Sequence, residues 1–211
     1  MTPWAGIPHG EGGTQVDVID VHRRTGELFR DIVRQVPAGS WDRPTPCTEW
    51  NARELVNHVV GEDRWTQPLM AGKTIADVGD ALTGDLLGDD PAEAAEAAWA
   101  EAAQAAPPAV RDAATVHLSY GDEMAAEYAS QLAADHLIHG WDLAVATGGP
   151  TALPADLVEA VAGWFAAREE LYRGAGIVAA RPPLPDGATA QDRLLAGFGR
   201  DPRWAPPPPP G

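Results

Sequence analysis

Three polar side chains with the chemistry of metal ligands lie within eight residues of one another in this sequence. Asp135, His139 and Asp142 follow at intervals of four and three residues, which places all three on one face of an α-helix. Tyr128 and Leu132 continue the same stripe, so this face should point to the interior. A buried carboxylate and imidazole are costly unless they are neutralised, and a divalent cation shared by Asp135 and His139 would neutralise them. The alternative is a solvated ion pair between residues one turn apart.

His58 is the histidine that could complete such a site. It lies at the edge of the apolar face of another predicted helix, where a lone histidine is usually a core or boundary residue. A catalytic zinc site needs three protein ligands and an open position, and Asp135 with His139 supplies two. A fourth protein ligand, such as His136 or Glu62, would close the coordination sphere and indicate a non-catalytic site. Otherwise His136, which lies one residue off the stripe, is expected to pack or to form a hydrogen bond.

Other reactive side chains have weaker patterns around them. Asp142 could orient a ligand histidine or accept a proton as a catalytic base, or it could bond to backbone within the bundle. Cys47 precedes a predicted helix N-terminus, where a thiol can become a nucleophile. We interpret it as a packing residue, because no histidine or basic residue adjoins it. His9, His22 and His117 have no ligand-like neighbours in the sequence and are not expected to take part.

The composition excludes several classes of partner. The 211 residues include 15 Lys+Arg and 31 Asp+Glu, for a net charge of −16. Nucleic acids and anionic membranes attract basic surfaces, so neither is an expected partner. The single cysteine excludes an internal disulfide and a cysteine-based zinc cluster. No apolar run approaches the length of about 18 residues that spans a bilayer, and residues 1–13 lack a signal-peptide pattern. We therefore expect a cytoplasmic protein that acts on small molecules.

Apolar spacing and capping residues predict the helices that must position these side chains. The predicted helical segments are 15–36, 51–68, 90–106, 122–147, 154–171 and 189–198. Amphipathic helices of this length bury their apolar faces against each other, so we expect an all-α four-helix bundle. The third and sixth segments would be extra helices, and residues 114–120 could form one short strand.

The two ends of the chain differ in composition from the middle. Residues 1–14 are rich in glycine and proline and are predicted to be a disordered extension. Residues 201–211 contain five consecutive prolines and are predicted to be a proline-rich tail. The helical bundle is predicted to occupy residues 15–200.

Three segments of the sequence resemble signatures of a known family. Residues 41–58 (WDRPTPCTEWNARELVNH) look like the first signature of the DinB-like, mycothiol-dependent maleylpyruvate isomerase N-terminal-domain family. Residues 139–148 (HGWDLAVATG) resemble its second signature. Residues 192–202 (DRLLAGFGRDP) are similar to the end of its short actinobacterial metal-binding members. Together the signatures cover nearly the whole chain, in order.

The resemblance implies a DinB-like four-helix bundle with a divalent metal, usually zinc, near one end. Carried over to this sequence, the family's metal ligands would be His58, Asp135 and His139. The family's isomerase has glutamate at the acidic position, so the aspartate here is one methylene shorter. The isomerases also carry a C-terminal domain that helps to form the substrate site. A proline tail follows the bundle here, so isomerisation of a ring-cleavage product is not the expected reaction.

Three functions are compatible with this site. In the first, mycothiol or a similar small thiol binds the metal, loses its proton and attacks a small electrophile, in an S-transfer or an isomerisation. In the second, metal-activated water performs a hydrolase, lyase or isomerase step without a thiol. The lack of an obvious basic residue for an anionic substrate would fit this second function. The third is a non-catalytic metal-binding or ligand-binding bundle. Substrate, metal identity and oligomeric state, monomer or homodimer, stay open.

Overall fold

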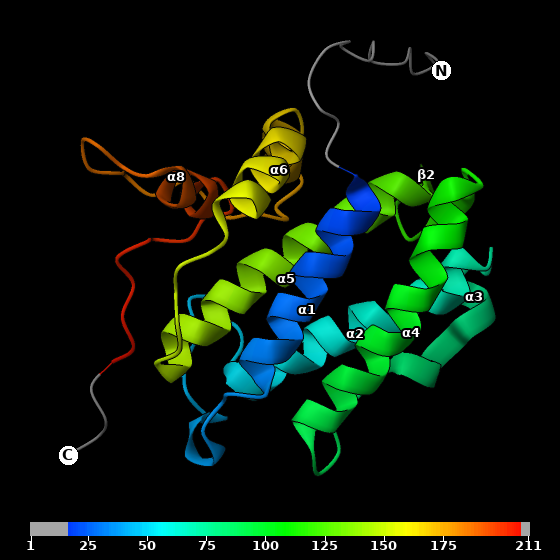
Figure 1. The fold of residues 1–211 in the computed structure, drawn as a ribbon, viewed down its shortest axis with the longest axis horizontal. Coiled ribbons are helices and arrows are strands. Elements are labelled where there is room, and N and C mark those ends of the chain that lie inside the picture. The colour runs from blue at the N-terminus through cyan, green and yellow to red at the C-terminus, as the bar shows by residue number, and fades with distance from the viewer. Residues whose placement is uncertain (1–16, 208–211) are drawn as a thin grey trace.

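The computed structural model describes residues 17–207, and helices dominate it (Figure 1). The helices are α1 (Val18–Val33), α2 (Ala52–Met70), α3 (Ile75–Val78), α4 (Pro91–Arg111), α5 (Ala125–Thr147), α6 (Ala155–Ala166), α7 (Glu169–Gly174) and α8 (Ala190–Gly197), with 3-10 turns η1 (Ala38–Ser40) and η2 (Gly79–Leu82). The strands are β1 (Thr115–Leu118) and β2 (Gly121–Met124). The all-α prediction is confirmed. The predicted extension, residues 1–14, lies outside the described residues.

Side-chain caps start three of these helices where the sequence predicts them. Asn51 accepts a hydrogen bond from the Glu54 amide at 2.9 Å, and the Glu54 carboxylate accepts one from the Asn51 amide, so α2 begins with a capping box. Asp90 caps α4. Thr189 and Asp192 form the same box at α8. Local hydrogen bonds therefore fix the start of α2, the helix that carries His58.

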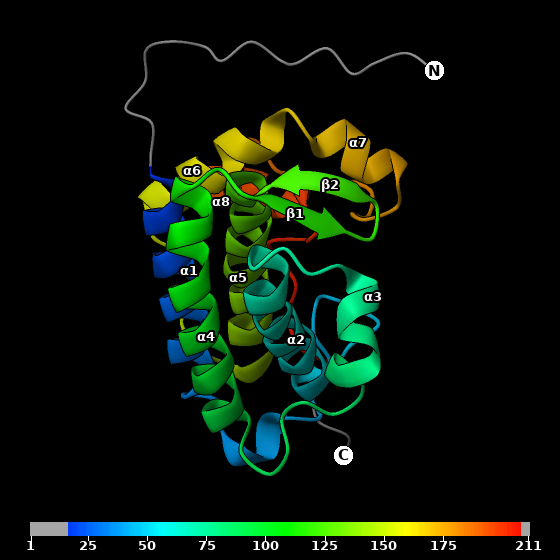
Figure 2. The ribbon, with the colours of Figure 1, turned by 90° about the vertical axis from the view of Figure 1, so that its right-hand side faces the viewer.

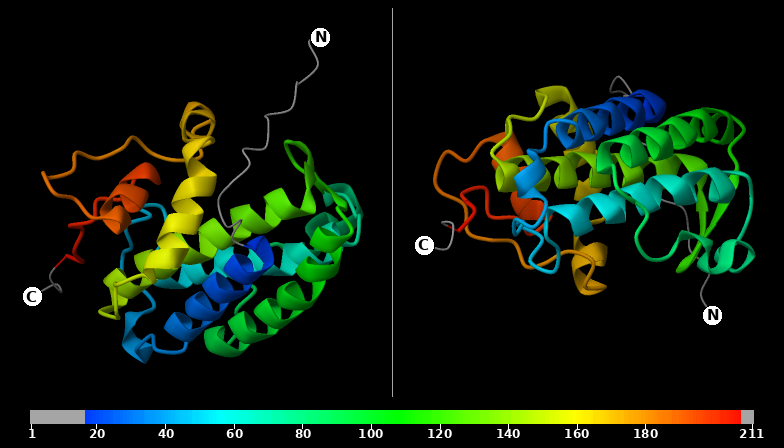
Figure 3. Two further views of the ribbon diagram at one scale, coloured as in Figure 1. Left: turned by 45° about the horizontal axis from the view of Figure 1, so that its top comes forward. Right: turned by 90° about the horizontal axis from the view of Figure 1, so that it is seen from below.

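Helices α1, α2, α4 and α5 form the four-helix bundle (Figures 2 and 3). The sequence predicts the segment 154–171 as a bundle helix and 90–106 as an extra helix. This prediction is wrong, because α4 packs within the bundle and α6 packs outside it. The alanine-rich face of α4 gives a weak apolar pattern, yet it lets α4 approach its neighbours closely. Gly26 of α1 illustrates the fit, because a Cβ there would lie 2.3 Å from the ring of Trp99 on α4.

Helix α5 is the central helix, and α6 and α8 pack outside the bundle. Apolar side chains of α1, α5, α6 and α8 form one cluster, in which the rings of Phe165 and Phe198 stack at 4.0 Å. The predicted helix 154–171 divides into α6 and α7. The division occurs near Arg168, whose Nε turns back to donate to Glu127 of α5 at 2.6 Å.

The segment before α5 is a hairpin, in contrast to the predicted single strand and helix start at residue 122. Strands β1 and β2 pair antiparallel, with Thr115 opposite Met124 and Leu118 opposite Gly121. The Asp122 side chain bonds to Nδ1 of His117 across the hairpin at 2.7 Å. It therefore makes a cross-strand contact, and α5 begins at Ala125.

Two helices continue further than the sequence predicts. Helix α2 includes Pro68 and ends at Met70, and α4 includes Pro107 and Pro108 and ends at Arg111. Each of these prolines lacks the N–H that would bond the carbonyl four residues earlier, and each helix ends within four residues of its proline. In the part of the chain that the structure describes, no helix is both long and apolar enough to cross a bilayer.

Candidate metal centre

His58, Asp135 and His139 converge at the interface of α2 and α5. Each offers one ligand atom, and these atoms all lie within 4.8 Å of one another. His58 Nε2 is 3.7 Å from Asp135 Oδ2, and the rings of His58 and His139 meet edge to face at 5.2 Å between centroids. The structure thus brings together the two helices that the sequence could only pair through the family resemblance.

The spacing of these donor atoms fits a small divalent cation. Nitrogen and oxygen ligands bind zinc at about 2.1 Å, so two ligands of a tetrahedral ion lie about 3.4 Å apart. The 3.7 Å between His58 Nε2 and Asp135 Oδ2 is close to that value. Two imidazoles and a carboxylate suit zinc and several other divalent metals. Their role as ligands stays a prediction, and the geometry is compatible with it.

Asp142 orients His139 through the Nδ1 side of the imidazole ring. His139 Nδ1 lies 3.1 Å from Asp142 Oδ2, so a proton on Nδ1 leaves Nε2 as the free donor atom. This is the arrangement in which a carboxylate orients a metal-binding histidine. Asp142 lies one turn further along α5 and is fully buried. Of the three roles predicted for Asp142, the geometry favours orientation of a histidine over proton transfer and over a bond to backbone.

Arg200, which the sequence analysis did not single out, is the counter-ion of Asp142. Its Nη2 donates to Asp142 Oδ2 at 2.9 Å, and its Nε donates to the same carboxylate at 3.2 Å. Burial alone would raise the pKa of Asp142, but the charge of Arg200 and the contact with His139 outweigh it, and the pKa lies below its ordinary value. A short chain of contacts therefore runs from Arg200 through Asp142 to His139.

Cys47 belongs to a second group of possible ligands on the far side of His139. Donor atoms of Cys47, His139 and Asp142 also lie within 4.8 Å of one another, but Nη2 of Arg200 donates to the Cys47 sulfur at 3.2 Å. The guanidinium already neutralises this group. The sequence predicts that no basic residue adjoins Cys47. This is wrong for the folded protein, because Arg200, which is distant in the sequence, contacts the thiol. Burial is the main cause that raises the pKa of the thiol; the charge of Arg200 lowers it and nearby carboxylates raise it, and the resulting pKa lies above its ordinary value.

The two residues considered as a fourth ligand, His136 and Glu62, lie outside the converging group. His136 points into the core, where Nε2 is 2.9 Å from Asp63 Oδ1 of α2, as its predicted hydrogen-bonding role requires. Glu62 lies one turn after His58 on α2. Burial and the charge of Asp135 raise the pKa of Glu62 to about 7. Within residues 17–207, the converging set around Asp135 consists of three residues.

The histidines set aside in the sequence analysis are also outside this group. His117 lies on the hairpin and bonds Asp122. His22 is buried beside His136, with 5.7 Å between the ring centroids. His22 therefore has a neighbouring histidine in space that the sequence did not indicate. Among the described residues it belongs to no group of converging ligand atoms. His9 lies outside the described residues.

The open side of the site is an acidic groove. Trp50 stacks on His58 at 4.5 Å between ring centroids and forms one wall. A groove of about 630 Å³ continues from there between the start of α2 and the loop that follows η2. The residues that line it are Glu49, Trp50, Arg53, Glu54, Asn57, His58, Gly84 and Asp85. Arg53 is engaged by Asp85 at 3.0 Å. The groove therefore offers a solvent path to His58 with an excess of carboxylates.

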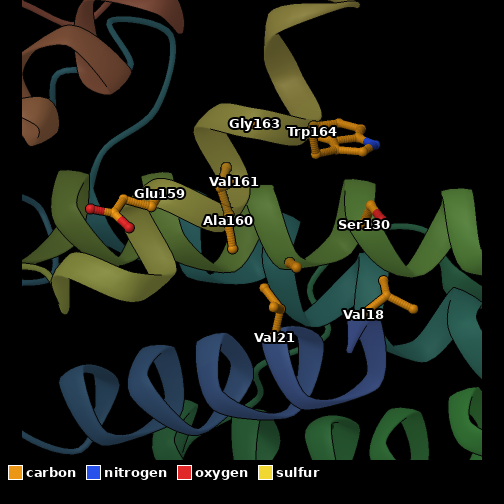
Figure 4. A pocket seen from close by; sticks show the side chains of 9 residues that line it. Val18, Val21, Ser130, Glu159, Ala160, Val161, Gly163 and Trp164 are labelled. Atoms are coloured by element: carbon orange, nitrogen blue, oxygen red, sulfur yellow. The ribbon is translucent and has the colours of Figure 1, made fainter. Parts of the chain in front are cut away.

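A second, smaller groove lies away from these residues (Figure 4). It measures about 300 Å³ and is formed by α1, α5 and α6, with Val18, Ser130 and Trp164 among its lining residues. None of the proposed ligands lines it. We therefore assign the candidate chemistry to the acidic groove.

The helical bundle is consistent with the DinB-like fold, and a histidine of α2 faces an aspartate and a histidine of α5 in an arrangement compatible with metal binding. The chain belongs to the mycothiol maleylpyruvate isomerase N-terminal-domain family, whose sequence model matches residues 22–144. This stretch contains the three proposed ligands and Asp142 but ends before Arg200. The family membership predicted from the sequence is thus confirmed.

Two curated relatives match most of this chain and nearly all of their own length. They are the uncharacterized proteins Rv0738 and MT0763 from two strains of Mycobacterium tuberculosis, H37Rv and CDC 1551. Each is 32% identical over 191 residues, which cover 88% of this chain and 98% of the relative. No solved structure matches the chain significantly.

Proposed function

We propose that the protein is a divalent-metal-dependent enzyme, with zinc as the first candidate metal, in which a small thiol attacks a small electrophile. His58, Asp135 and His139 are the proposed ligands, and mycothiol or a similar thiol is the proposed co-substrate, in an S-transfer or isomerisation. The observation that carries the proposal is the convergence of these three donors beside an open groove. The family supports a mycothiol-related domain.

The metal would supply Lewis acidity that lowers the pKa of the thiol bound to it. The residues of the chain would do the rest. Asp142 and Arg200 would hold His139 in one orientation, so that the ligand set is formed before the thiol arrives. Trp50 would shield one face of His58 from water. Cys47, with its raised pKa, is kept as a protonated thiol and is not proposed as the nucleophile.

The charges of the groove indicate the class of electrophile. Glu49, Glu54 and Asp85 face it, and its one lining cation, Arg53, is paired with Asp85. Arg200 is committed to Asp142. A dianionic substrate would meet net repulsion here, since like charges in a partly enclosed groove repel. We therefore propose a neutral or cationic electrophile. We also propose that the protein acts in the cytoplasm, where small thiols stay reduced.

Metal content tests the site. Purified protein is incubated with zinc, dialysed and analysed by mass spectrometry, next to His58→Ala/His139→Ala and the control His117→Ala. We expect about one zinc per chain in the wild type and in the control, as for a single three-ligand site, and none in the double variant. A wild type without stoichiometric metal would end the proposal.

The thiol has a separate test. Zinc-loaded protein is mixed with mycothiol and monochlorobimane, a neutral electrophile, and the fluorescent adduct is followed with time. We expect a rate above the uncatalysed background that is lost in the His58→Ala/His139→Ala variant. A rate equal to background at every thiol concentration would reject thiol chemistry on this electrophile class.

One observation favours a second candidate, in which the same metal site acts without a thiol. Glu62 lies one turn from His58, and its pKa is raised to about 7, a value suited to proton transfer near neutral pH. It could accept a proton from water in a hydrolase or lyase step. Turnover that persists without thiol and falls in Glu62→Gln would favour this candidate over the first.

A further inference from the structure

A buried hydrogen bond joins the two helices that carry the proposed ligands. His136 Nε2 of α5 lies 2.9 Å from Asp63 Oδ1 of α2. The two side chains are 1% and 4% exposed, so water does not compete for the contact. In this bond a ring Nε2–H donates and the carboxylate oxygen accepts. Among the hydrogen bonds of residues 17–207, this is the one side-chain bond between α2 and α5.

The partners of this bond are close to the proposed ligands in sequence but point elsewhere. His136 directly follows Asp135, and Asp63 comes five residues after His58. Successive residues of a helix point about 100° apart, so His136 faces the core while Asp135 faces His58 of α2. Neither His136 nor Asp63 belongs to the converging donor groups. Any effect of the pair on metal binding must therefore act through the position of the helices.

The residues around His136 offer its ring no hydrogen-bond partner other than Asp63 in the described part of the chain. The His136 ring lies against Trp99 of α4 at 5.5 Å and Phe29 of α1 at 6.1 Å between centroids. His136 Nδ1 has no hydrogen-bond partner in the described part of the chain. Asp63 therefore accepts the only hydrogen bond found for this ring. A slide of α5 along α2 by one residue, about 1.5 Å, would stretch or misalign this bond, and a slide by one turn, about 5.4 Å, would break it and leave two buried polar groups unpaired.

The same slide would also spoil the ligand set, because metal bonds tolerate errors of about 0.2 Å. We propose that Asp63 and His136 are positioning residues that lock α2 and α5 in the register at which His58 meets Asp135 and His139. The inference rests on the proposed metal site and adds to it a pair of residues that never touch the ion. Loss of the lock leaves the three ligands present but lets their helices shift.

Cobalt binding to the full chain tests the lock, because Co²⁺ reports both affinity and coordination geometry through its visible spectrum. Asp63→Leu/His136→Leu removes the bond and replaces both partners with apolar groups, a change that buried pairs often tolerate. Asp63→Asn keeps an acceptor oxygen for Nε2–H. Thr147→Val is the matched control, since this buried α5 hydroxyl bonds only Leu143 O of its own helix. Circular dichroism first establishes that each variant is folded.

We expect the double variant to bind Co²⁺ about tenfold or more weakly with an altered spectrum, as for outer-sphere changes at metal sites. Asp63→Asn and Thr147→Val should stay close to the wild type. Equal affinity and spectrum in the double variant would overturn the inference while leaving the metal site intact. Equal weakening in Thr147→Val would overturn it too, because the effect would then be general instability.

Two further outcomes are also decisive. A wild type that binds no Co²⁺ rejects the proposed metal site, and the positioning role falls with it. If the double variant does not fold, His136→Asn replaces it under the same criteria. Its shorter side chain stays polar but does not reach Asp63, so wild-type affinity and spectrum in that variant would refute the lock.

Discussion

Removal of the Arg200 guanidinium should expose the cost of an unpaired carboxylate in the core. Asp142 is 0% exposed and the Arg200 side chain is 13% exposed, so the ion pair is nearly dry. In Arg200→Leu, Asp142 keeps its contact with His139 but loses its counter-charge and the hydrogen bonds from two donor atoms, Nε and Nη2. Breaking one side of a buried ion pair costs about 3–5 kcal/mol.

We take the lower end of that range, because the small exposed fraction of Arg200 admits some water. A loss of about 3 kcal/mol corresponds to a fall in Tm of about 6–12 °C for a chain of this size. Urea unfolding followed by circular dichroism at pH 7 measures the free energy of unfolding, and a thermal scan measures Tm.

The double variant Arg200→Leu/Asp142→Asn separates charge from packing. A neutral amide needs no counter-ion, so it should recover about half or more of the lost free energy, since the cost of a single deletion is mainly the unpaired charge. The reasoning is refuted if Arg200→Leu lies within about 0.5 kcal/mol of the wild type, the range of ordinary surface changes. It is also refuted if the double variant is no more stable than the single one.

Three further outcomes follow from burial and packing. Cys47, whose pKa is raised by burial and carboxylates, should react with iodoacetamide more slowly than free cysteine at pH 8, with unfolded protein as the fast control. Gly26→Ala should cost about 1–3 kcal/mol by overpacking Trp99, whereas Gly163→Ala, with nothing within 4 Å of the new Cβ, should be neutral or stabilising in urea unfolding. Burial lowers the pKa of His22 to about 3, so the unfolded state binds the proton first, and stability should fall as pH drops from 6.5 towards 3, by up to about 1.4 kcal/mol per pH unit.

Each of these has a result that contradicts it. Rapid alkylation of folded Cys47 would show that the thiol is ionised or exposed. Equal effects of the two glycine substitutions would contradict the close approach of α1 and α4. An unchanged pH slope in His22→Gln, compared with the wild type in the same pH window, would contradict a buried neutral imidazole.

Local patterns predicted the features that depend on neighbours in the chain. The cap at Asn51 and the stripe of Asp135, His139 and Asp142 are set by hydrogen bonds and spacing within one helix, and the structure has them as expected. The hairpin was missed because Asp122 after a glycine is also typical of a helix start. Cross-strand pairing with His117 decides between these alternatives.

Features that depend on tertiary contacts were less accessible. That His58 lies opposite Asp135 followed from the family resemblance, since spacing alone cannot pair residues on separate helices. The place of α4 in the bundle was missed because alanines carry little apolar signal, although Gly26 and Trp99 fit together tightly. Arg200 and Asp142 are 58 residues apart in the sequence, so no local pattern predicts their contact. The sequence shows only a basic residue within the segment Gly-Arg-Asp-Pro.

The anchoring of His139 by a residue near the end of the chain limits how far the protein can be trimmed. The family match ends at residue 144, so a fragment cut to those boundaries would hold every proposed ligand and still lack the guanidinium that Asp142 faces. A fragment that keeps the contact between Arg200 and Asp142 must therefore include α8 and the turn at Gly199. Excision experiments and sequence-guided domain design in this family should retain them.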